Sequence, residues 1–434
     1  MNRRSFLKTA AVTSFAALAL PNWLAHAAPE RPGGRRPNII VILADDVGLG
    51  DLGCYGGRFK TPAIDALAAG GTRFEYSYAT PLCGPSRCQL LTGRYPFRTG
   101  LNSNGRSTAV NPTREVMIPT MLKKAGYVTA CVGKWGQIAL GPREWGFDES
   151  LSFLGNGRYW REQTKDYIVN GKPAELLPGQ YLPDLMHKFL VDFLTRHKAE
   201  PFFVYYPLSH VHTPIVRTPD SQPGADGKQL YADNIAYMDK LVGQLVSELE
   251  RLQVRDNTLV IFAGDNGSRN QSTLNGRPIF GTKETLLEGG SRVPLIANWP
   301  GTTPAGRVNH DLTDFSDFFA TIGELGGATL PTGVTLDSRS FAPQLKGQKG
   351  EPREWVYVEL NGAAYVRDAR FKLTNAGAFF DLKDAPFAEL PVPADTTDDA
   401  ARAVRKRLQA VLDQHPAAPA SGVHGGAKAA GPPK

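Results

Sequence analysis

The chain has 434 residues, of which 41% are hydrophobic, and a formal net charge of +7. A chain of this length and composition can bury a sizeable core in one large domain or two, so disorder is not the expected state. The charge surplus is too small and too scattered to indicate a nucleic-acid partner, although it is compatible with an anionic substrate.

The N-terminal segment has the parts of an export signal. Two adjacent arginines, Arg3 and Arg4, precede a short stretch of small and apolar residues, and an A-x-A cleavage site ends at Ala27. This order predicts a twin-arginine signal peptide over residues 1–27, with the twin-arginine translocase as a partner and a periplasmic or secreted location. The alternative, a membrane anchor, needs an apolar run of roughly 20 residues, which the chain lacks, so we expect no stable membrane span.

Apolar runs of strand length recur along the chain, each followed by a polar cluster. They lack an alternation of polar and apolar residues, which is typical of strands covered on both faces. Helical patterns, notably 182–197 and 231–252, lie between them. Strands and helices in turn predict an α/β domain over 36–345, with a mixed, mostly parallel central sheet flanked by helices. The expected strands are 39–43, 128–132, 202–206, 259–262 and 294–297.

The pattern changes near residue 350. Short apolar runs at hairpin spacing, followed by one helical pattern, predict a small subdomain over 350–413 with an antiparallel sheet. Residues 414–434 are rich in Ala, Gly and Pro and hold few large apolar side chains, so we expect a disordered tail. Within the subdomain the expected strands are 355–360, 364–367 and 371–374, and the expected helix is 399–413.

Polar clusters follow four of the expected strands. In an open α/β sheet the loops at the carboxyl ends of the strands converge, and ligands bind there. Two of these strand ends offer only oxygen ligands, which suit Ca²⁺ or Mg²⁺ better than Zn²⁺. Either cluster alone could be a helix cap or a turn, but their equivalent positions favour a metal site. The oxygen ligands are Asp45, Asp46, Asp265 and Asn266, and the other two strand ends supply Lys134, His210 and His212.

A run of five residues, C-G-P-S-R, begins at Cys83 and leads into a predicted helix that ends at Gly93. Cys83 would lie just before the N-terminus of this helix, where free backbone N–H groups and the helix dipole favour an anion. Arg87, one turn further on, adds a fixed positive charge. The alternative is a buried cysteine beside an ordinary helix cap.

With these residues the chain resembles the type I, formylglycine-dependent sulfatase family of the alkaline-phosphatase-like superfamily. The resemblance extends from the strand before Asp45, through the C-x-P-S-R signature and the L-T-G-R that follows it, to Phe380-Asp381-Leu382. It implies that a maturation enzyme oxidises Cys83 to formylglycine, which is hydrated to a geminal diol. It also implies hydrolysis of a sulfate ester of a small molecule or an oligosaccharide. One diol oxygen attacks sulfur and displaces the alcohol, and loss of a proton from the second hydroxyl then expels sulfate.

The resemblance also implies roles for the other site residues. Arg87 steadies the diol, while Lys134 and Lys283 bind the sulfate and offset the charge of the transition state. His212 protonates the leaving oxygen, and for His210 a structural role is favoured. The implied metal is Ca²⁺, with Mg²⁺ as the alternative, and the implied ligands are Asp45, Asp46, Cys83, Asp265 and Asn266.

The chain departs from the family at one place. The family commonly has G-K-W-H, with the histidine as the base of sulfate release, whereas this chain has Gly136 and then Gln137 after Lys134-Trp135. The amide of Gln137 can position the sulfate but cannot serve as a base. Either another group, such as Asp265 or a water, takes the proton, or turnover is slower.

The segment 155–160 contains Arg158 and is expected at the rim of the substrate pocket. Aromatic residues beside an arginine suit a sugar ring, so a sulfated carbohydrate is preferred over an aryl or alkyl sulfate, although core packing would explain the aromatics equally well. Two alternatives stay open. One is a phosphodiester or phosphonate monoester hydrolase of the same superfamily, and the other, suggested by Gly136, is an inactive binder of a sulfated ligand.

Three cysteines remain once Cys83 is set aside. An odd number allows at most one disulfide, and twin-arginine substrates are generally exported already folded. We therefore expect buried free thiols at Cys54, Cys88 and Cys131.

Overall fold

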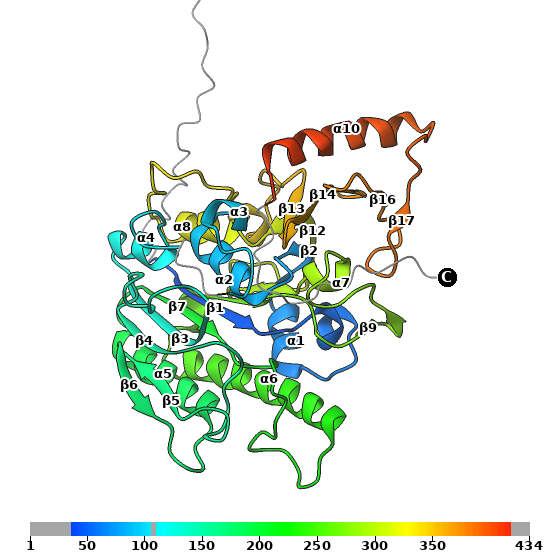
Figure 1. Cartoon of the computed structure of the whole chain (residues 1–434). Helices are drawn as coiled ribbons and strands as arrows, with labels where there is room; N and C mark the ends of the chain where they lie inside the picture. Colours follow the sequence, from blue (N-terminus) through cyan, green and yellow to red (C-terminus); the bar gives the residue numbers. More distant parts are fainter. Residues whose placement is uncertain (1–35, 106–109, 418–434) are drawn as a thin grey trace, which may run out of the picture. The chain divides into compact units, whose positions relative to one another are not determined.

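The computed structural model describes residues 36–105 and 110–417 of the chain (Figure 1). The predicted signal peptide, 1–27, and residues 418–434 of the predicted tail lie outside the described residues. Among the helices of the described part, none has both the length and the apolar character needed to cross a membrane.

The main sheet contains ten strands, in the order β12 (Arg307–Asp314), β2 (Thr72–Tyr78), β11 (Leu295–Asn298), β8 (Thr258–Gly264), β1 (Asn38–Ala44), β7 (Phe202–Pro207), β3 (Val128–Gly136), β4 (Glu149–Leu154), β5 (Asp166–Val169) and β6 (Lys172–Glu175). β1 pairs in parallel with both β7 and β8. β11 and β5 run antiparallel to their neighbours. The predicted mixed, mostly parallel sheet is therefore confirmed.

The five expected strands are all present, as β1, β3, β7, β8 and β11. In the main sheet the sequence prediction missed β2, β4, β5, β6 and β12 because it relied on continuous apolar runs. β2 reads T-R-F-E-Y-S-Y and β12 reads R-V-N-H-D-L-T-D. Both lie at one end of the strand order, where the strands are only partly buried and can carry polar side chains.

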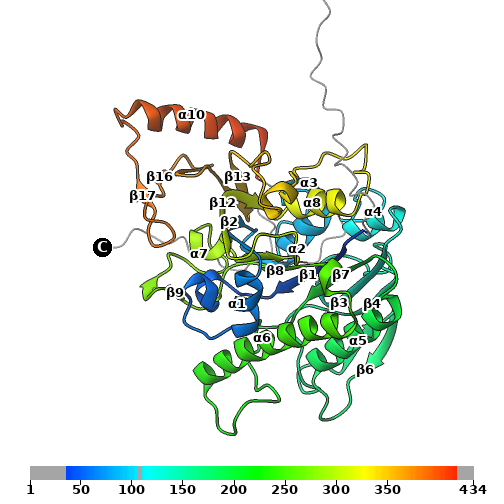
Figure 2. The same ribbon diagram turned by 180° about the vertical axis from the view of Figure 1, so that it is seen from behind.

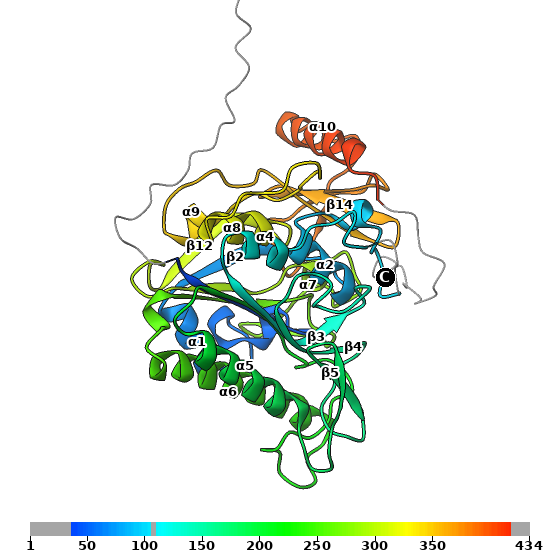
Figure 3. The same ribbon diagram turned by 90° about the vertical axis from the view of Figure 1, so that its left-hand side faces the viewer.

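Helices cover both faces of the main sheet. On one face lie α1 (Pro62–Ala69), α5 (Leu182–His197) and α6 (Gly227–Arg251), and on the other α2 (Cys83–Thr92), α4 (Ile118–Lys124) and α8 (Asp317–Leu325) (Figure 3). Alternate residues of β1 serve the two faces, since Ile40 and Ile42 pack with the first group and Ile39 and Val41 with the second. Shorter elements are η1 (Leu49–Asp51), η2 (Gly53–Tyr55), α3 (Pro96–Thr99), η3 (Arg255–Asn257), β9 (Thr273–Leu274), β10 (Arg277–Pro278), α7 (Glu288–Ser291) and α9 (Ala342–Leu345).

A second, separate sheet has five antiparallel strands in chain order, β13 (Val356–Leu360), β14 (Ala363–Arg367), β15 (Phe371–Thr374), β16 (Phe379–Asp381) and β17 (Leu390–Pro391). α10 (Asp399–Gln414) lies along this sheet (Figures 1 and 2) and buries Leu408 and Leu412 against it. The predicted antiparallel sheet and helix are confirmed, and the helix extends one residue further than expected. The domain boundaries at 345 and 350 stay predictions.

Cys54, Cys88 and Cys131 are free thiols, as expected, and the unmodified Cys83 is free as well. Cys88 and Cys131 are buried, whereas Cys54 is only partly buried. Burial raises the pKa of the Cys88 thiol to about 12, which keeps it protonated and unreactive.

Candidate active site

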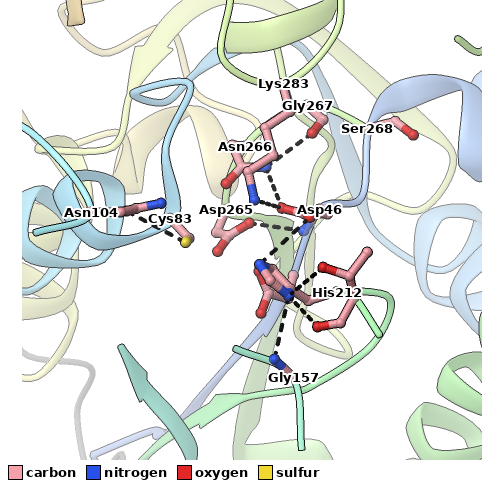
Figure 4. A network of polar contacts seen from close by, with 12 residues as sticks. Asp46, Cys83, Asn104, Gly157, His212, Asp265, Asn266, Gly267, Ser268 and Lys283 are labelled. Carbon is pink, nitrogen blue, oxygen red and sulfur yellow. Dashed lines mark hydrogen bonds and ion pairs between the residues drawn. The ribbon is translucent and has the colours of Figure 1, made fainter. Parts of the chain in front are cut away.

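The carboxyl ends of β1 and β8 bring four of the predicted metal ligands together, and Figure 4 shows Asp46, Asp265 and Asn266 of this group. Asp45 and Asp46 follow β1 directly, and Asp265 and Asn266 follow β8. Because the last residues of the two strands pair in parallel register, the two polar pairs leave the sheet side by side. The backbone N–H of Asp46 donates to Oδ1 of Asp265 at 3.0 Å, which joins the two strand ends.

Three buried oxygen atoms of this cluster have no hydrogen-bond partner among the described residues. They are Oδ1 of Asp45, Oδ2 of Asp46 and Oδ1 of Asn266. An unpaired buried acceptor costs roughly 1–3 kcal/mol, so three in one place are the donor arrangement expected of a cation site. Carboxylate oxygens of Asp45, Asp46 and Asp265 lie within 4.8 Å of one another. This all-oxygen donor set fits Ca²⁺ or Mg²⁺.

Two buried cations, Lys134 and Arg87, lie against the acidic cluster. Lys134 Nζ is 2.5 Å from Oδ2 of Asp45, and the Arg87 guanidinium donates to Oδ2 of Asp265 at 3.1 and 2.7 Å. Burial disfavours the charged form of Asp45, but Lys134 and Arg87 outweigh it and hold the pKa of this carboxyl well below its usual range. Burial and the charge of Asp45 raise the pKa of Asp265. A bound cation would relieve this repulsion between carboxylates.

Lys283 reaches the same cluster from the loop between β10 and α7 (Figure 4). Its Nζ is 2.5 Å from Oδ1 of Asp46, and the side-chain amide of Asn266 donates to that oxygen at 2.9 Å. Burial opposes the positive charge, but the Asp46 carboxylate raises the pKa of Lys283, so its side chain stays cationic. Both lysines predicted to bind sulfate therefore lie at the acidic cluster.

Cys83 is the first residue of α2, whereas the sequence prediction placed it just before the helix. Its Sγ lies 3.7 Å from Nζ of Lys134, and the thiol donates to Oδ1 of Asn104 at 3.6 Å. The backbone N–H of Gly84 donates to the same Asn104 oxygen at 3.0 Å. Burial raises the pKa of the Cys83 thiol, so the encoded side chain is a weak nucleophile.

Asn104 is a site residue that the sequence prediction missed. It belongs to the segment L-N-S-N-G, which has the composition of an ordinary loop. Asn104 lies 21 positions after Cys83, and no spacing rule links the two residues. Only the folded chain brings its side chain to the cysteine.

Gln137 lies beside the start of α2, and its position explains why residue 84 is a glycine. Its Oε1 atom is 2.7 Å from where a Cβ on Gly84 would lie, so a larger residue there would force Gln137 to move. Gly136 has a φ of +82°, in the left-handed region that favours glycine. A Cβ on Gly136 would also lie 3.3 Å from Cδ of Arg87. The backbone of this chain thus disfavours the histidine that the family commonly has.

His212 follows β7 and points toward the acidic cluster (Figure 4). Its Nε2 is 3.9 Å from Oδ2 of Asp46, and its Nδ1 is 2.7 Å from the Thr213 carbonyl. The backbone N–H of Gly157 also approaches Nδ1, at 3.3 Å, and the shorter contact assigns the ring proton to Nδ1. Burial lowers the pKa of His212, so the ring is neutral, and the charge of a bound sulfate would favour its protonation.

His210 instead lies in a group of tyrosines. Its Nε2 is 2.9 Å from the hydroxyl of Tyr181, and its ring packs against Tyr159 and Tyr237. Burial lowers the pKa of His210 to about 3. A neutral ring held in this way supports the surrounding loops and does not exchange protons near neutral pH.

A pocket of about 710 Å³ adjoins the start of α2. Asn104 and Gln137 line it, and both also lie beside the first two residues of that helix. Arg158 lines the same pocket, so two of the predicted substrate-binding residues share one cavity. Its apolar surface comes from Trp135, Ile138, Leu140, Leu154 and Ile168.

The sequence model of the sulfatase family matches residues 37–328. N-acetylgalactosamine-6-sulfatase of Canis lupus familiaris is 36% identical over 386 residues, which cover 77% of this chain and 71% of that protein. Arylsulfatase A of Bos taurus is 33% identical over 427 residues, which cover 88% of this chain and 80% of that protein.

Solved structures show the same similarity. The crystal structure of Ps i-CgsB has a TM-score of 0.77 at 28% identity and covers 88% of this chain and 92% of its own. That protein has also been solved in complex with k-i-k-neocarrahexaose. PsFucS1 sulfatase from Pseudoalteromonas sp. has a TM-score of 0.76 at 26% identity and covers 89% of this chain and 92% of its own. The chain therefore belongs to the sulfatase family of the alkaline-phosphatase-like superfamily and is a sulfuric ester hydrolase.

Proposed function

We propose that this sulfatase hydrolyses the sulfate ester of a carbohydrate through a formylglycine made from Cys83 and a bound Ca²⁺, with Mg²⁺ as the alternative. The observation that carries the proposal is the group of buried, unpartnered oxygens beside Cys83 and two lysines. When bound, the cation supplies positive charge that lowers the pKa of a hydroxyl group and neutralises the sulfate. Besides residue 83, the proposed ligands are Asp45, Asp46, Asp265 and Asn266.

The side chains around position 83 bind and orient the ester in this proposal. Lys134 and Lys283 offer ammonium groups to the sulfate oxygens, where negative charge grows during the reaction. Arg87 donates to Asp265 and to the carbonyl of Lys134 at 3.0 Å, and through these bonds it holds the start of α2 in place. His212 donates a proton to the leaving alcohol oxygen.

Release of sulfate needs a proton acceptor, and Gln137 does not fill that role. We assign it the orientation of the sulfate through its side-chain N–H, because the Gln137 side chain lies beside residue 84 with its Oε1 buried there. Asp265 or a water takes the proton. The proposal therefore places attack and release on different groups, which allows each step to be tested by itself.

The carbohydrate part of the proposal has two supports. One relative is named for N-acetylgalactosamine 6-sulfate, and Ps i-CgsB has been solved with a neocarrahexaose. The pocket beside α2 has about 710 Å³, a size that accommodates small ligands such as a sugar ring. Arg158 would give this pocket a cation at its rim.

Maturation and export complete the proposal. A formylglycine-generating enzyme in the producing cell converts Cys83, and the twin-arginine translocase then exports the folded protein through its signal peptide, 1–27. The site of action is the periplasm or the medium. This order follows from the buried position of Cys83, which a maturation enzyme reaches more readily before folding is complete.

The test combines mass spectrometry with a substrate panel. Protein made with the maturation enzyme is expected to carry formylglycine at position 83 and to release sulfate from a sulfated mono- or oligosaccharide, whereas Cys83→Ala releases none. Fully active protein with an unmodified cysteine contradicts the formylglycine mechanism. Faster turnover of an aryl phosphodiester supports the phosphodiesterase alternative, and binding without turnover by fully modified protein supports an inactive binder.

A further inference from the structure

The loop that carries Lys283 has no regular secondary structure. The backbone N–H of Lys283 donates to the Ser268 carbonyl at 2.9 Å, and the Lys283 ammonium reaches Asp46. Loops of this kind move unless contacts hold them. Besides the bond from the Glu284 N–H to the Pro81 carbonyl at 3.1 Å, the other contacts that fix this loop come from the C-terminal subdomain and help to decide where the ammonium lies.

Lys372, on β15, holds the loop three residues beyond Lys283. Its ammonium donates to the carbonyl of Leu286 at 2.5 Å and to the two carboxylate oxygens of Glu389 at 2.7 and 2.8 Å. An ammonium has three donors, so this one is fully used between the loop and Glu389. Lys372 thus joins the loop backbone to Glu389, an arrangement that we call the Lys372 clamp.

Arg367, on β14, holds the end of the same loop. Its Nη1 donates to Oε1 of Glu288 at 3.1 Å, and the hydroxyl of Tyr78 donates to the same carboxylate at 3.1 Å. Before the loop starts, the backbone N–H of Phe280 donates to the carbonyl of Pro386 at 2.8 Å. The C-terminal subdomain therefore contacts the Lys283 loop near its start, in its middle and at its end.

These charged contacts are costly to bury. The side chains of the Arg367–Glu288 and Lys372–Glu389 pairs are only 1–2% exposed. Replacing a buried ion pair by apolar residues of similar volume is often neutral or stabilising, so stability alone does not explain the two pairs. The two pairs instead fix the geometry of their surroundings, because a buried ammonium or guanidinium holds its acceptors at defined distances.

We propose that Lys372 and Arg367 are positioning residues that hold Lys283 where its ammonium can bind the sulfate of the substrate. The proposal rests on the sulfate-binding role of Lys283 given above. The proposal also gives the C-terminal subdomain a part in the reaction, although the sheet of that subdomain is separate from the main sheet. A misplacement of about 1 Å at such a group is enough to cost a large factor in rate.

The test replaces the Lys372–Glu389 pair by an apolar pair, Lys372→Met with Glu389→Leu. This double variant leaves no unpaired buried charge, so it is expected to fold. Loss of the bond to the Leu286 carbonyl is expected to raise the inhibition constant of inorganic sulfate about 10-fold, equivalent to about 1.4 kcal/mol. Amide hydrogen exchange should rise over residues 281–290 and not across the main sheet, and mass spectrometry confirms equal formylglycine content.

A second pair serves as the matched control. Arg353 and Asp317 are also buried and oppositely charged, with 4% and 2% exposure, and they form hydrogen bonds with residues between 314 and 339, away from the Lys283 loop. The variant Arg353→Met with Asp317→Asn removes this pair and keeps an oxygen for one of the two backbone N–H groups, of Asp314 and Arg339, that donate to Asp317. It is expected to lower the melting temperature by at least as much, with the inhibition constant of sulfate unchanged.

A double-mutant cycle separates this proposal from the proposed function. In a Lys283→Ala background, the apolar swap is expected to change the inhibition constant of sulfate less than about 2-fold, because Lys372 acts through Lys283. A full 10-fold effect in that background, or none in the native background, overturns the positioning role. If Lys283→Ala alone leaves the inhibition constant of sulfate unchanged, it is the sulfate-binding role of Lys283 that is wrong. If the swap does not fold, Lys372→Gln with Glu389→Gln, which also removes the ammonium without leaving an unpaired charge, tests the same prediction.

Discussion

The two sides of Cys83 are built from different chemistry. On one side, strand ends and one loop supply paired charges, such as Lys134 with Asp45 at 2.5 Å. On the other side, Asn104 and Gln137 supply neutral amides from irregular segments. The charged side is fixed by sheet register, whereas the amide side depends on loop conformation and on glycines at 84 and 136. In the proposed mechanism, charged groups therefore assist the attack on sulfur, whereas the amide side offers the release of sulfate only neutral groups.

The largest effect is expected from removing a charge on the charged side. Asp45→Asn should eliminate metal binding and lower kcat/KM by at least about 10³-fold, because it weakens a ligand and leaves Lys134 without its carboxylate. Metal content and sulfate release measure the two effects. Asp51→Asn is the control, since Asp51 is also a buried acid but lies outside the acidic cluster. Metal content equal to that of the native protein in Asp45→Asn would contradict the assignment.

Removing the metal itself is expected to destabilise the charged side. A chelator should lower the melting temperature, since a ligand present at 100 times its Kd adds about 2.7 kcal/mol to stability. Adding Ca²⁺ back should restore both melting temperature and activity, and Mg²⁺ should do so less well. The Asp45→Asn variant should show no such shift. A chelator effect of the same size in that variant would place the ion elsewhere.

Introducing the histidine that the family commonly has at position 136 should not accelerate the release of sulfate. Gly136→His is expected to cost about 1–2 kcal/mol of stability, because position 136 has a left-handed backbone, and to give no gain in sulfate release. Gly136→Ala is the control for backbone strain and should cost a similar amount. If Gly136→His instead accelerates release, the missing imidazole limits turnover and the explanation from backbone geometry is wrong.

Asn104 offers a smaller test of the amide side. Asn104→Ala removes the acceptor for the Gly84 N–H, a loss of about 1–3 kcal/mol if it is left unsatisfied, and we expect kcat to fall about 10-fold. Ser103→Ala, in the same loop, is expected to leave kcat close to that of the native protein. Equal activity of Asn104→Ala and native protein would show that the contact with residues 83 and 84 is incidental.

The smallest effect is expected at Gln137. In the proposed mechanism Gln137 only orients the sulfate, so Gln137→Ala should reduce turnover by about 2- to 5-fold, as expected for one lost neutral hydrogen bond. Rapid quenching followed by mass spectrometry measures covalent sulfation of residue 83 separately from release. Covalent sulfation without any release in this variant would mean that Gln137 has an essential role in the second step.

The accuracy of the sequence prediction varied with the kind of signal. α5 begins and ends at the predicted residues 182 and 197, because its apolar residues recur at helical spacing. α6 begins four residues before the predicted 231, since its N-cap is Asp226, whose side chain accepts from the Gln229 N–H. Asn104 and the Lys372 clamp gave no local signal at all. Contacts of this kind depend on residues far apart in the chain.

The sequence by itself determined the family, the buried strands and the charged residues at their ends. Its signals are local, since an apolar run, a motif or a capping residue acts within a few positions of itself. Tertiary structure alone decided that Asn104 contacts Cys83, that Gly136 has a backbone unsuited to histidine, and that β14 and β15 hold the Lys283 loop. These features arise from packing between distant segments, where distance and burial determine the energy of each contact.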